Sequence, residues 1–321
     1  MSFRRSSSSL LKLFKNESLF STYRFSSKTT GEYCLNYVKK YDYENFVCTL
    51  LLENSARASA LAVRSFNIEI AQVVENVSQE TIGLMRLKFW EETVEKCLST
   101  NYKLVPKHPV AQELFRANSM KKLSKRYLHN LINSRKTTLN ILGFKSLEDM
   151  EKYTEQSVSN VYYLILESCD VKNIDADHAA SHLGKAQGIV QHIRSVPHAA
   201  RLNFLAIPDD ILIKNKVSQE HIRRAKNSKE LHECIFEIAS RAHQHLMKAR
   251  SLMEKVPQEG RKVLLPAVPV FIYLERLQKV DYNVFHPSLQ HRSWKLLPQL
   301  WFTNFRKNLL CKILIANIFY I

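Results

Sequence analysis

Four arginines lie in or beside two apolar stretches of the sequence, where their side chains could bind an anion. Arg57 and Arg64 belong to the first stretch, and Arg194 and Arg201 to the second. A guanidinium group pairs well with phosphate through parallel hydrogen bonds, so these residues are candidates for holding an anionic head group. The alternative is structural: each arginine neutralises a buried carboxylate or extends its charged end into solvent.

A second group that could do chemistry is formed by Asp175, His178 and His182. Their spacing places them on one face of a helix, and imidazole with carboxylate is a donor set that suits zinc. The same spacing often arises without a metal, and the sequence contains no HExxH motif. An aspartate at position 175 or 177 is also explained without a metal, because it can cap a helix that begins there. We therefore predict no metal site and no cofactor.

The two apolar stretches resemble segments of the squalene/phytoene synthase family. They are ARASALAVRSFNIEIAQV, residues 56–73, and HLGKAQGIVQHIRSVPHAARLNFLAIP, residues 182–208. In that family the first corresponds to a helix with a DDxxD motif. The second corresponds to a helix with an Arg followed by a DxxxD motif, and Arg194 matches that Arg. The resemblance covers roughly residues 33–300 and implies an all-α, isoprenoid synthase-type helical bundle around a central cavity.

The acidic motifs of the family are missing from the matching positions. Asn67, Ile68 and Ala71 stand where the resemblance places DDxxD, and Ser195 and Ala199 stand where it places DxxxD. Joining two prenyl diphosphates requires Mg²⁺, held by carboxylates on facing helices, to neutralise the departing diphosphate. The resemblance therefore implies a protein of this fold without catalytic residues.

The residues near these motif positions do not compensate for the missing carboxylates. Glu69 lies about 100° around a helix from Ile68, so its carboxylate should point away from the motif face. Pro197 lies between the two DxxxD positions, where its ring would disturb the helical spacing.

Within the family, four strings are similar to the mitochondrial members that act as assembly factors for respiratory complex I. They are RSFNIEIAQV, GLMRLKFWEE, GKAQGIV and DYNVFHPSL. This similarity implies a non-catalytic assembly factor or chaperone, acting on complex I subunits at early membrane-arm intermediates. The alternatives are a binder of prenyl diphosphate or anionic lipid, and a residual prenyltransferase.

The elements that must position these residues are helices. The sequence has six Gly and nine Pro, and its apolar residues recur at three and four positions instead of alternating. We expect caps at Asp42, Ser78 and Ser146, and Pro109 in the first turn of a helix. The expected helices are 42–52, 55–77, 79–98, 109–118, 124–140, 146–169, 175–195, 218–225, 229–255, 266–279 and one from 288 onward.

Residues 1–30 have the composition of a mitochondrial transit peptide. They are rich in Ser, they contain a single acid, Glu17, and their Leu and Phe residues can form one apolar helix face. Their basic residues are Arg4, Arg5, Lys12, Lys15, Arg24 and Lys28. A disordered basic tail without a targeting role is the alternative. We predict a helical domain over residues 31–305 and a divergent apolar tail over residues 306–321.

The formal net charge is +17, and a strongly basic chain remains when residues 1–30 are set aside. Such a charge favours an anionic partner, which could be an acidic protein surface or anionic lipid such as cardiolipin. The sequence has none of the common nucleic-acid-binding motifs, so we expect no nucleic acid. No apolar run reaches the length of a membrane span. The expected location is peripheral, on the matrix side of the mitochondrial inner membrane.

Overall fold

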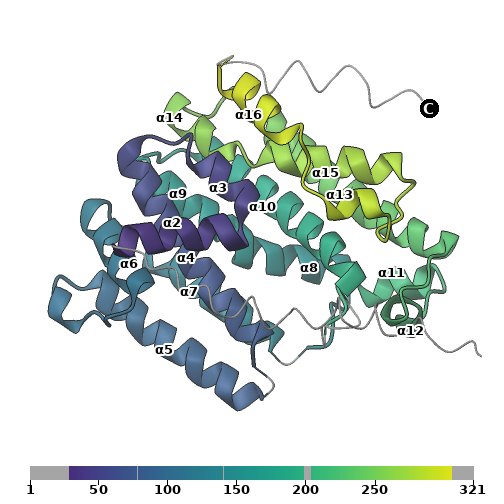
Figure 1. Ribbon diagram of the computed structural model, residues 1–321, viewed down its shortest axis with the longest axis horizontal. Helices are drawn as coiled ribbons and strands as arrows, with labels where there is room; N and C mark the ends of the chain where they lie inside the picture. Colours follow the sequence, from purple (N-terminus) through teal and green to yellow (C-terminus); the bar gives the residue numbers. More distant parts are fainter. Residues whose placement is uncertain (1–28, 78, 140, 199–203, 306–321) are drawn as a thin grey trace, which may run out of the picture.

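The computed structural model describes residues 29–77, 79–139, 141–198 and 204–305, and in this part of the chain every named element is helical (Figure 1). An isolated bridge joins Gly143 to Leu205. The all-α prediction is therefore confirmed. Ala199, Arg201, Ser78 and the segments 1–28 and 306–321 lie outside the described residues.

The first half of the described chain supplies the helices on one side of the molecule. They are α2 (Thr30–Tyr41), α3 (Tyr43–Thr49), α4 (Asn54–Glu75), α5 (Glu80–Leu98), α6 (Pro109–Met120) and α7 (Lys125–Thr138). A short 3-10 turn, η2 (Tyr102–Leu104), lies between α5 and α6.

The second half begins with a helix that contains one π-helical turn. Its parts are α8 (Leu147–Thr154), η3 (Glu155–Ser159) and α9 (Asn160–Ser168). There follow α10 (Ile174–Ser195), η4 (Val196–His198), α11 (Asp209–Lys214), α12 (Gln219–Arg223), α13 (Lys229–Ser251), α14 (Gln258–Arg261), η5 (Lys262–Leu264), α15 (Ala267–Lys279), η6 (Pro287–Gln290) and α16 (Leu296–Phe305).

The core forms where helices from the two halves meet. Helix α4 packs against α2, α6, α7 and α9, while α10 packs along α13 and contacts α8, η3, α9 and α15. The largest side chains of this core are fully buried and include Phe66, Tyr162 and Leu164. A smaller apolar cluster joins α3, α15 and α16. Among the described residues, no helix combines the length and the apolarity that a bilayer crossing requires.

Two glycines let α10 approach the π-helical turn closely. A Cβ atom added to Gly184 would lie 2.5 Å from Ser159 Cα, and one added to Gly188 would lie 2.5 Å from Thr154 Cβ. Real Cβ atoms do not come this close to other carbon atoms, so a side chain at either position would push α10 away from α8 and η3.

Most predicted helices are present, but several of their ends differ. The predicted caps at Asp42 and Ser146 are both at helix starts, although only Ser146 accepts a hydrogen bond through its side chain, from Asp149 N at 3.2 Å. Pro109 is in the first turn of α6 as expected.

Two predicted caps are wrong. Helix α10 is capped by Asn173, whose side chain accepts from Ala176 N at 2.9 Å, and not by Asp175 or Asp177. The cap of α5 is Gln79, one residue beyond the predicted Ser78. An Asn side chain reaches the free N–H groups of the first turn as well as Asp does, so composition alone could not choose between them.

Candidate functional site: a cavity between the central helices

A cavity of about 570 Å³ lies between α4, α7, α9 and α10. Its apolar lining comes from Val74, Val77, Leu139, Ile141, Leu142, Val158, Val161 and Phe204. Its polar lining comes from Asp42, Asn45, Arg64, Asn67, Glu75, Glu80, Arg135, Thr138, Tyr153, Ser157, Tyr162, Gln187, Gln191, His192 and Ser195. The cavity is therefore large enough for a small amphiphile and can contact both a chain and a polar head.

The structure brings one residue from each degenerate motif to this cavity. Asn67 on α4 and Ser195 at the end of α10 both line it. Asn67 Oδ1 accepts a hydrogen bond from Arg135 Nη2 at 3.1 Å, and Ser195 Oγ donates to the carbonyl oxygen of His192 at 2.8 Å. The two motif positions at the cavity therefore hold an amide and a hydroxyl group, and both groups already form hydrogen bonds within the protein.

The other described motif positions, Ile68 and Ala71, do not contribute a ligand. Ile68 is buried in an apolar cluster with Val38, Phe46 and Leu61, away from the cavity. Ala71 is half-buried, and its methyl group offers no donor atom. Within the described residues, no three His, Cys, Asp or Glu side chains are arranged to hold a metal ion. The residues present therefore do not fit the magnesium-binding role that the fold family implies.

Glu69 points away from the cavity, as helical geometry predicts. Its Oε1 lies 3.8 Å from His108 Nε2, and its side chain is mostly buried. Burial raises the pKa of Glu69, while the nearby Tyr37 hydroxyl, which donates to Gln72 Oε1 at 2.8 Å, opposes that shift.

Of the candidate arginines, Arg64 lines the cavity. It is 6% exposed, its Nε donates to Thr49 Oγ1 at 3.0 Å, and its Nη1 lies 3.7 Å from Asp42 Oδ2. Arg64 therefore already has a protein carboxylate beside it.

The other candidate arginines have different surroundings. Arg194 makes a two-pronged contact with Glu44, at 2.7 and 3.1 Å, and lies 4.3 Å from the centre of the Tyr273 ring. Arg57 donates to the carbonyl oxygen of Leu52 at 2.9 Å. Neither lines the cavity. Anion binding by these arginines stays a prediction.

Sequence reasoning missed Arg135, the second arginine at the cavity. It is 7% exposed, and besides Asn67 it donates to Ser134 Oγ at 3.0 Å and to the Tyr153 hydroxyl at 3.2 Å. A signal was present, because Arg135 continues the buried face of α7 that includes Leu128 and Ile132 at helical spacing.

Two arginines and three carboxyl groups line the cavity, and the arginines are the more deeply buried. The charged residues among its described lining are Arg64 and Arg135 against Asp42, Glu75 and Glu80. Burial raises the pKa of Asp42 and of Glu75. Burial, followed by the nearby charge of Arg135, lowers the pKa of His192 to about 4, so its ring is neutral at pH 7. Both arginines already donate hydrogen bonds to protein groups, so a diphosphate would compete with those contacts.

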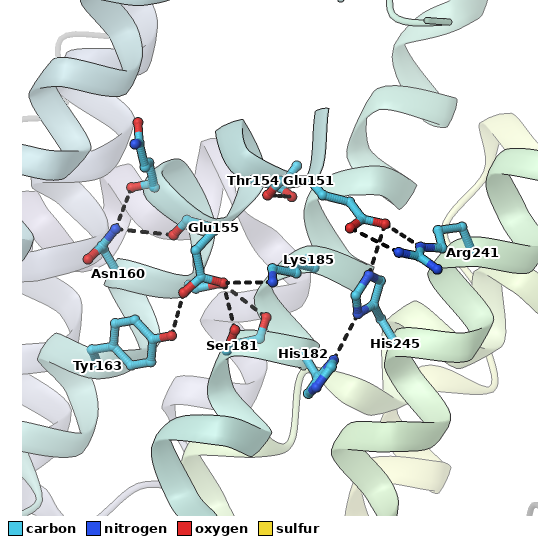
Figure 2. A network of polar contacts seen from close by, with 12 residues as sticks. Glu151, Thr154, Glu155, Asn160, Tyr163, Ser181, His182, Lys185, Arg241 and His245 are labelled. Carbon is cyan, nitrogen blue, oxygen red and sulfur yellow. Dashed lines mark hydrogen bonds and ion pairs between the residues drawn. The ribbon is translucent and has the colours of Figure 1, made fainter. Parts of the chain in front are cut away.

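A separate polar network ties α8 and η3 to α10 and α13 (Figure 2). Glu151 pairs with Arg241 and lies 3.1 Å from His245 Nε2, while His245 Nδ1 is 2.8 Å from His182 Nδ1. Burial would raise the pKa of Glu151, but the hydrogen bonds with Arg241 and His245 lower it overall. His182 is thus placed beside a second imidazole and not in a three-residue metal site with Asp175 and His178.

The same network is anchored at Glu155 on the π-helical turn (Figure 2). The Glu155 carboxylate accepts from the Tyr163 hydroxyl at 2.5 Å and from Ser181 Oγ at 2.7 Å, and it lies 3.7 Å from Lys185 Nζ. These contacts hold η3 against α9 and α10.

The class of protein follows from three features. These are the helical architecture, the central cavity, and the two motif positions, Asn67 and Ser195, that line it. The sequence profile of squalene/phytoene synthase matches residues 38–296, and the chain belongs to that family. Solved structures have the same fold: a dehydrosqualene synthase in complex with a ligand matches with a TM-score of 0.74 at 16% identity, covering 86% of this chain and 95% of that one. The squalene synthase from Alicyclobacillus acidocaldarius matches with a TM-score of 0.69 at 16% identity, covering 79% and 95%. The expected isoprenoid synthase-type fold is confirmed.

Several proteins with higher sequence identity to this chain are not named as synthases. The chain is 41% identical to the rat protein named NADH dehydrogenase (ubiquinone) complex I, assembly factor 6, over 86% of this chain and 82% of that one. It is 40% identical to the human protein of the same name, over 87% and 83%. It is 42% identical to the Drosophila melanogaster homologue, over 84% and 81%.

Proposed function

We propose that this protein is a non-catalytic assembly factor for mitochondrial respiratory complex I, acting on early membrane-arm intermediates. The observation that carries the proposal is identity of about 40%, over more than four-fifths of both chains, to mammalian proteins that share this name. The cavity supports it, because its lining has an amide and a hydroxyl at motif positions where a synthase needs carboxylates.

Deleting the gene tests this role. Fully assembled complex I should fall on native gels while the other respiratory complexes are spared, and a copy of the full sequence should restore it. Unchanged complex I in the deleted cells would contradict the proposal.

We further propose that the protein acts on the matrix side of the inner membrane as a peripheral protein. The composition of residues 1–30 supports import, and the basic domain supports attraction to anionic lipid. Isolated mitochondria should import the full chain and shorten it at its N-terminus. The product should resist external protease in intact mitochondria and leave the membrane fraction in alkaline carbonate.

The absence of synthase activity has its own test. Incubating the protein with farnesyl or geranylgeranyl diphosphate and Mg²⁺ should release no diphosphate above a blank. Metal-dependent release would favour a residual prenyltransferase instead. The variant with Asn67→Asp and Ser195→Asp should also be inactive, because a carboxylate at position 67 would be drawn to Arg135, whose Nη2 is 3.1 Å from Asn67 Oδ1.

A second function, ligand binding in the cavity, is favoured by the composition of its lining. Both cavity arginines already bond to protein groups, so the apolar walls beside them suit an apolar chain that ends in an uncharged hydroxyl or carbonyl group. Farnesol should therefore raise the melting temperature of the protein more than farnesyl diphosphate does at the same concentration. A larger shift with the diphosphate would favour the anionic ligand.

A further inference from the structure

Helix α16 is apolar on its outward side as well as on the side that packs. Leu296 and Leu300, one turn apart, are buried in the cluster with α3 and α15. Leu297 is 56% exposed, Trp301 59% and Phe302 47%. The helix contains no charged residue. Three polar residues lie beside these exposed side chains, namely Gln299, Thr303 and Asn304. A surface helix normally turns polar residues toward solvent, so the outward face of α16 is nevertheless unusual.

The exposed residues form one continuous face. At 100° per residue, Leu297, Pro298, Trp301 and Phe302 occupy an arc of about 140°, on the side away from the buried leucines. Trp294, just before the helix, is 80% exposed and enlarges the same apolar area. Figure 1 shows α16 at the edge of the molecule, beside α15.

The charged residues that follow Asp281 in the sequence are all basic. Asp281 is the last acidic residue of the sequence, and five Lys or Arg residues follow it. Two of these, Arg292 and Lys295, flank Trp294; Arg292 packs over the Tyr43 ring at 4.1 Å. Within the described part of the chain, neither forms an ion pair with a carboxylate. An apolar face thus lies beside uncompensated positive charge.

We propose that the outward face of α16, with Trp294, Arg292 and Lys295, docks the protein on an anionic lipid bilayer. The proposal rests on the membrane location proposed above and adds the surface responsible. Tryptophan favours the boundary between head groups and acyl chains, and basic side chains are attracted to anionic head groups. A helix of this kind lies in the plane of the interface without crossing the membrane.

A second copy of the chain fits this face less well. A symmetric dimer through α16 would bring the same basic residues of both copies toward one another, and like charges across an interface oppose association. An anionic lipid surface satisfies the apolar area and the charge together.

The tryptophans provide a direct readout of docking. The chain has three, of which Trp90 is 4% exposed while Trp294 and Trp301 are largely exposed. Adding phosphatidylcholine vesicles that contain cardiolipin should shift the fluorescence of the full chain to the blue. The shift should be weaker with pure phosphatidylcholine and should decrease as salt is raised. No shift with either vesicle would overturn the proposal.

The double variant Leu297→Ser with Phe302→Ser tests the surface while keeping both reporter tryptophans. It should bind cardiolipin vesicles at least roughly tenfold more weakly, because each large apolar side chain that is buried contributes about that factor or more. The matched control is Met85→Ser with Ile213→Ser, which removes side chains that are 71% and 77% exposed on α5 and α11. Figure 1 shows both helices far from α16. The control should bind like the unaltered protein.

Two results would contradict lipid docking through α16. If the α16 variant melts at the same temperature and still binds vesicles normally, this face does not dock on lipid. If the variant changes the oligomeric state but not vesicle binding, a second copy covers it. The native-gel experiment is separate, since normal vesicle binding with unchanged complex I would remove the assembly role and leave the docking surface.

Discussion

At the scale of single residues, the contact between Arg64 and Asp42 places opposite charges together at the cavity wall. The Arg64 side chain is 6% exposed and that of Asp42 25%. Arg64→Met should lower the free energy of unfolding by about 1–3 kcal/mol, because the largely buried Asp42 carboxyl keeps the Asn45 amide but loses the nearby positive charge. Urea denaturation measures the change.

An exposed pair offers the control for Arg64. Lys279 pairs with Glu275 on α15, and its side chain is 60% exposed. Lys279→Met should cost less than about 0.5 kcal/mol, since solvent screens such pairs. Adding Asp42→Asn to Arg64→Met should recover part of the loss, and equal effects of Arg64→Met and Lys279→Met would contradict this role of Arg64.

His192 should make the stability of the fold sensitive to acid. Its ring packs against Phe144 and Phe204 at the cavity, and burial together with Arg135 lowers its pKa to about 4. In the unfolded chain a histidine takes up its proton near pH 6.5. Between about pH 6.5 and 4 the unfolded state therefore binds more protons, and stability falls as the pH is lowered through this range.

The histidine prediction is checked by melting temperatures across that pH range. His192→Gln should have a shallower decline than the unaltered protein, while substitution of the exposed His291 by Gln should leave the slope unchanged. An identical slope in His192→Gln would show that other groups dominate. His182, whose pKa burial and its neighbour His245 lower to about 4, should keep part of the slope in every variant.

Three residues singled out from the sequence, Asn67, Ser195 and Arg64, line the cavity, but the sequence did not indicate which side chains pair with the arginines. Asn67 and Ser195 could be placed because the family resemblance locates them on two helices. The partners of Arg64 and Arg194 could not be predicted, because Asp42 and Glu44 come from a different helix and no periodicity within one segment encodes contacts between segments.

At the scale of elements, the close approach of α10 to η3 depends on Gly184 and Gly188. Alanine at either position should lower the free energy of unfolding by about 1–3 kcal/mol, which is the usual cost of overpacking a core. The reason is that the new Cβ would lie 2.5 Å from Ser159 Cα or Thr154 Cβ. Chemical denaturation of Gly184→Ala and Gly188→Ala measures the effect.

Gly31→Ala is the matched control for the glycines of α10. A Cβ there would meet Glu113 at 3.9 Å, an ordinary contact. Since alanine favours a helix over glycine by up to about 1 kcal/mol, this change should be neutral or stabilising. If all three substitutions behaved alike, the packing explanation would fail.

The sequence predicted where helices occur more reliably than whether a given helix is continuous. The pattern of residues 146–169 indicates one long helix, but the chain forms α8, a π-helical turn and α9 there. The π-helical turn positions Glu155 and Ser159 against α10, and this tertiary packing leaves no mark in local periodicity. Helix α2 was missed because the chain before Asp42 has a mixed polar and aromatic composition.

At the scale of the whole molecule, the squalene/phytoene synthase fold encloses a cavity that Asn67 and Ser195 both line. An assembly factor acts by binding other proteins through its surface and does not require an active site. The outward apolar face of α16 lies opposite the leucines that pack on α3 and α15, and none of the residues of α16 lines the cavity. Function at the surface and ligand binding inside the bundle can therefore be separated by substitution.

Val74→Phe makes that separation. Val74 is a half-buried residue of the cavity lining, so a larger side chain there should occupy space that a ligand would use without disturbing the outer surfaces. In cells that lack the gene, Val74→Phe should restore complex I on native gels to the level reached by the unaltered protein, while the melting shift with farnesol is lost. A folded Val74→Phe protein that fails to restore complex I would show instead that assembly requires the cavity and its ligand.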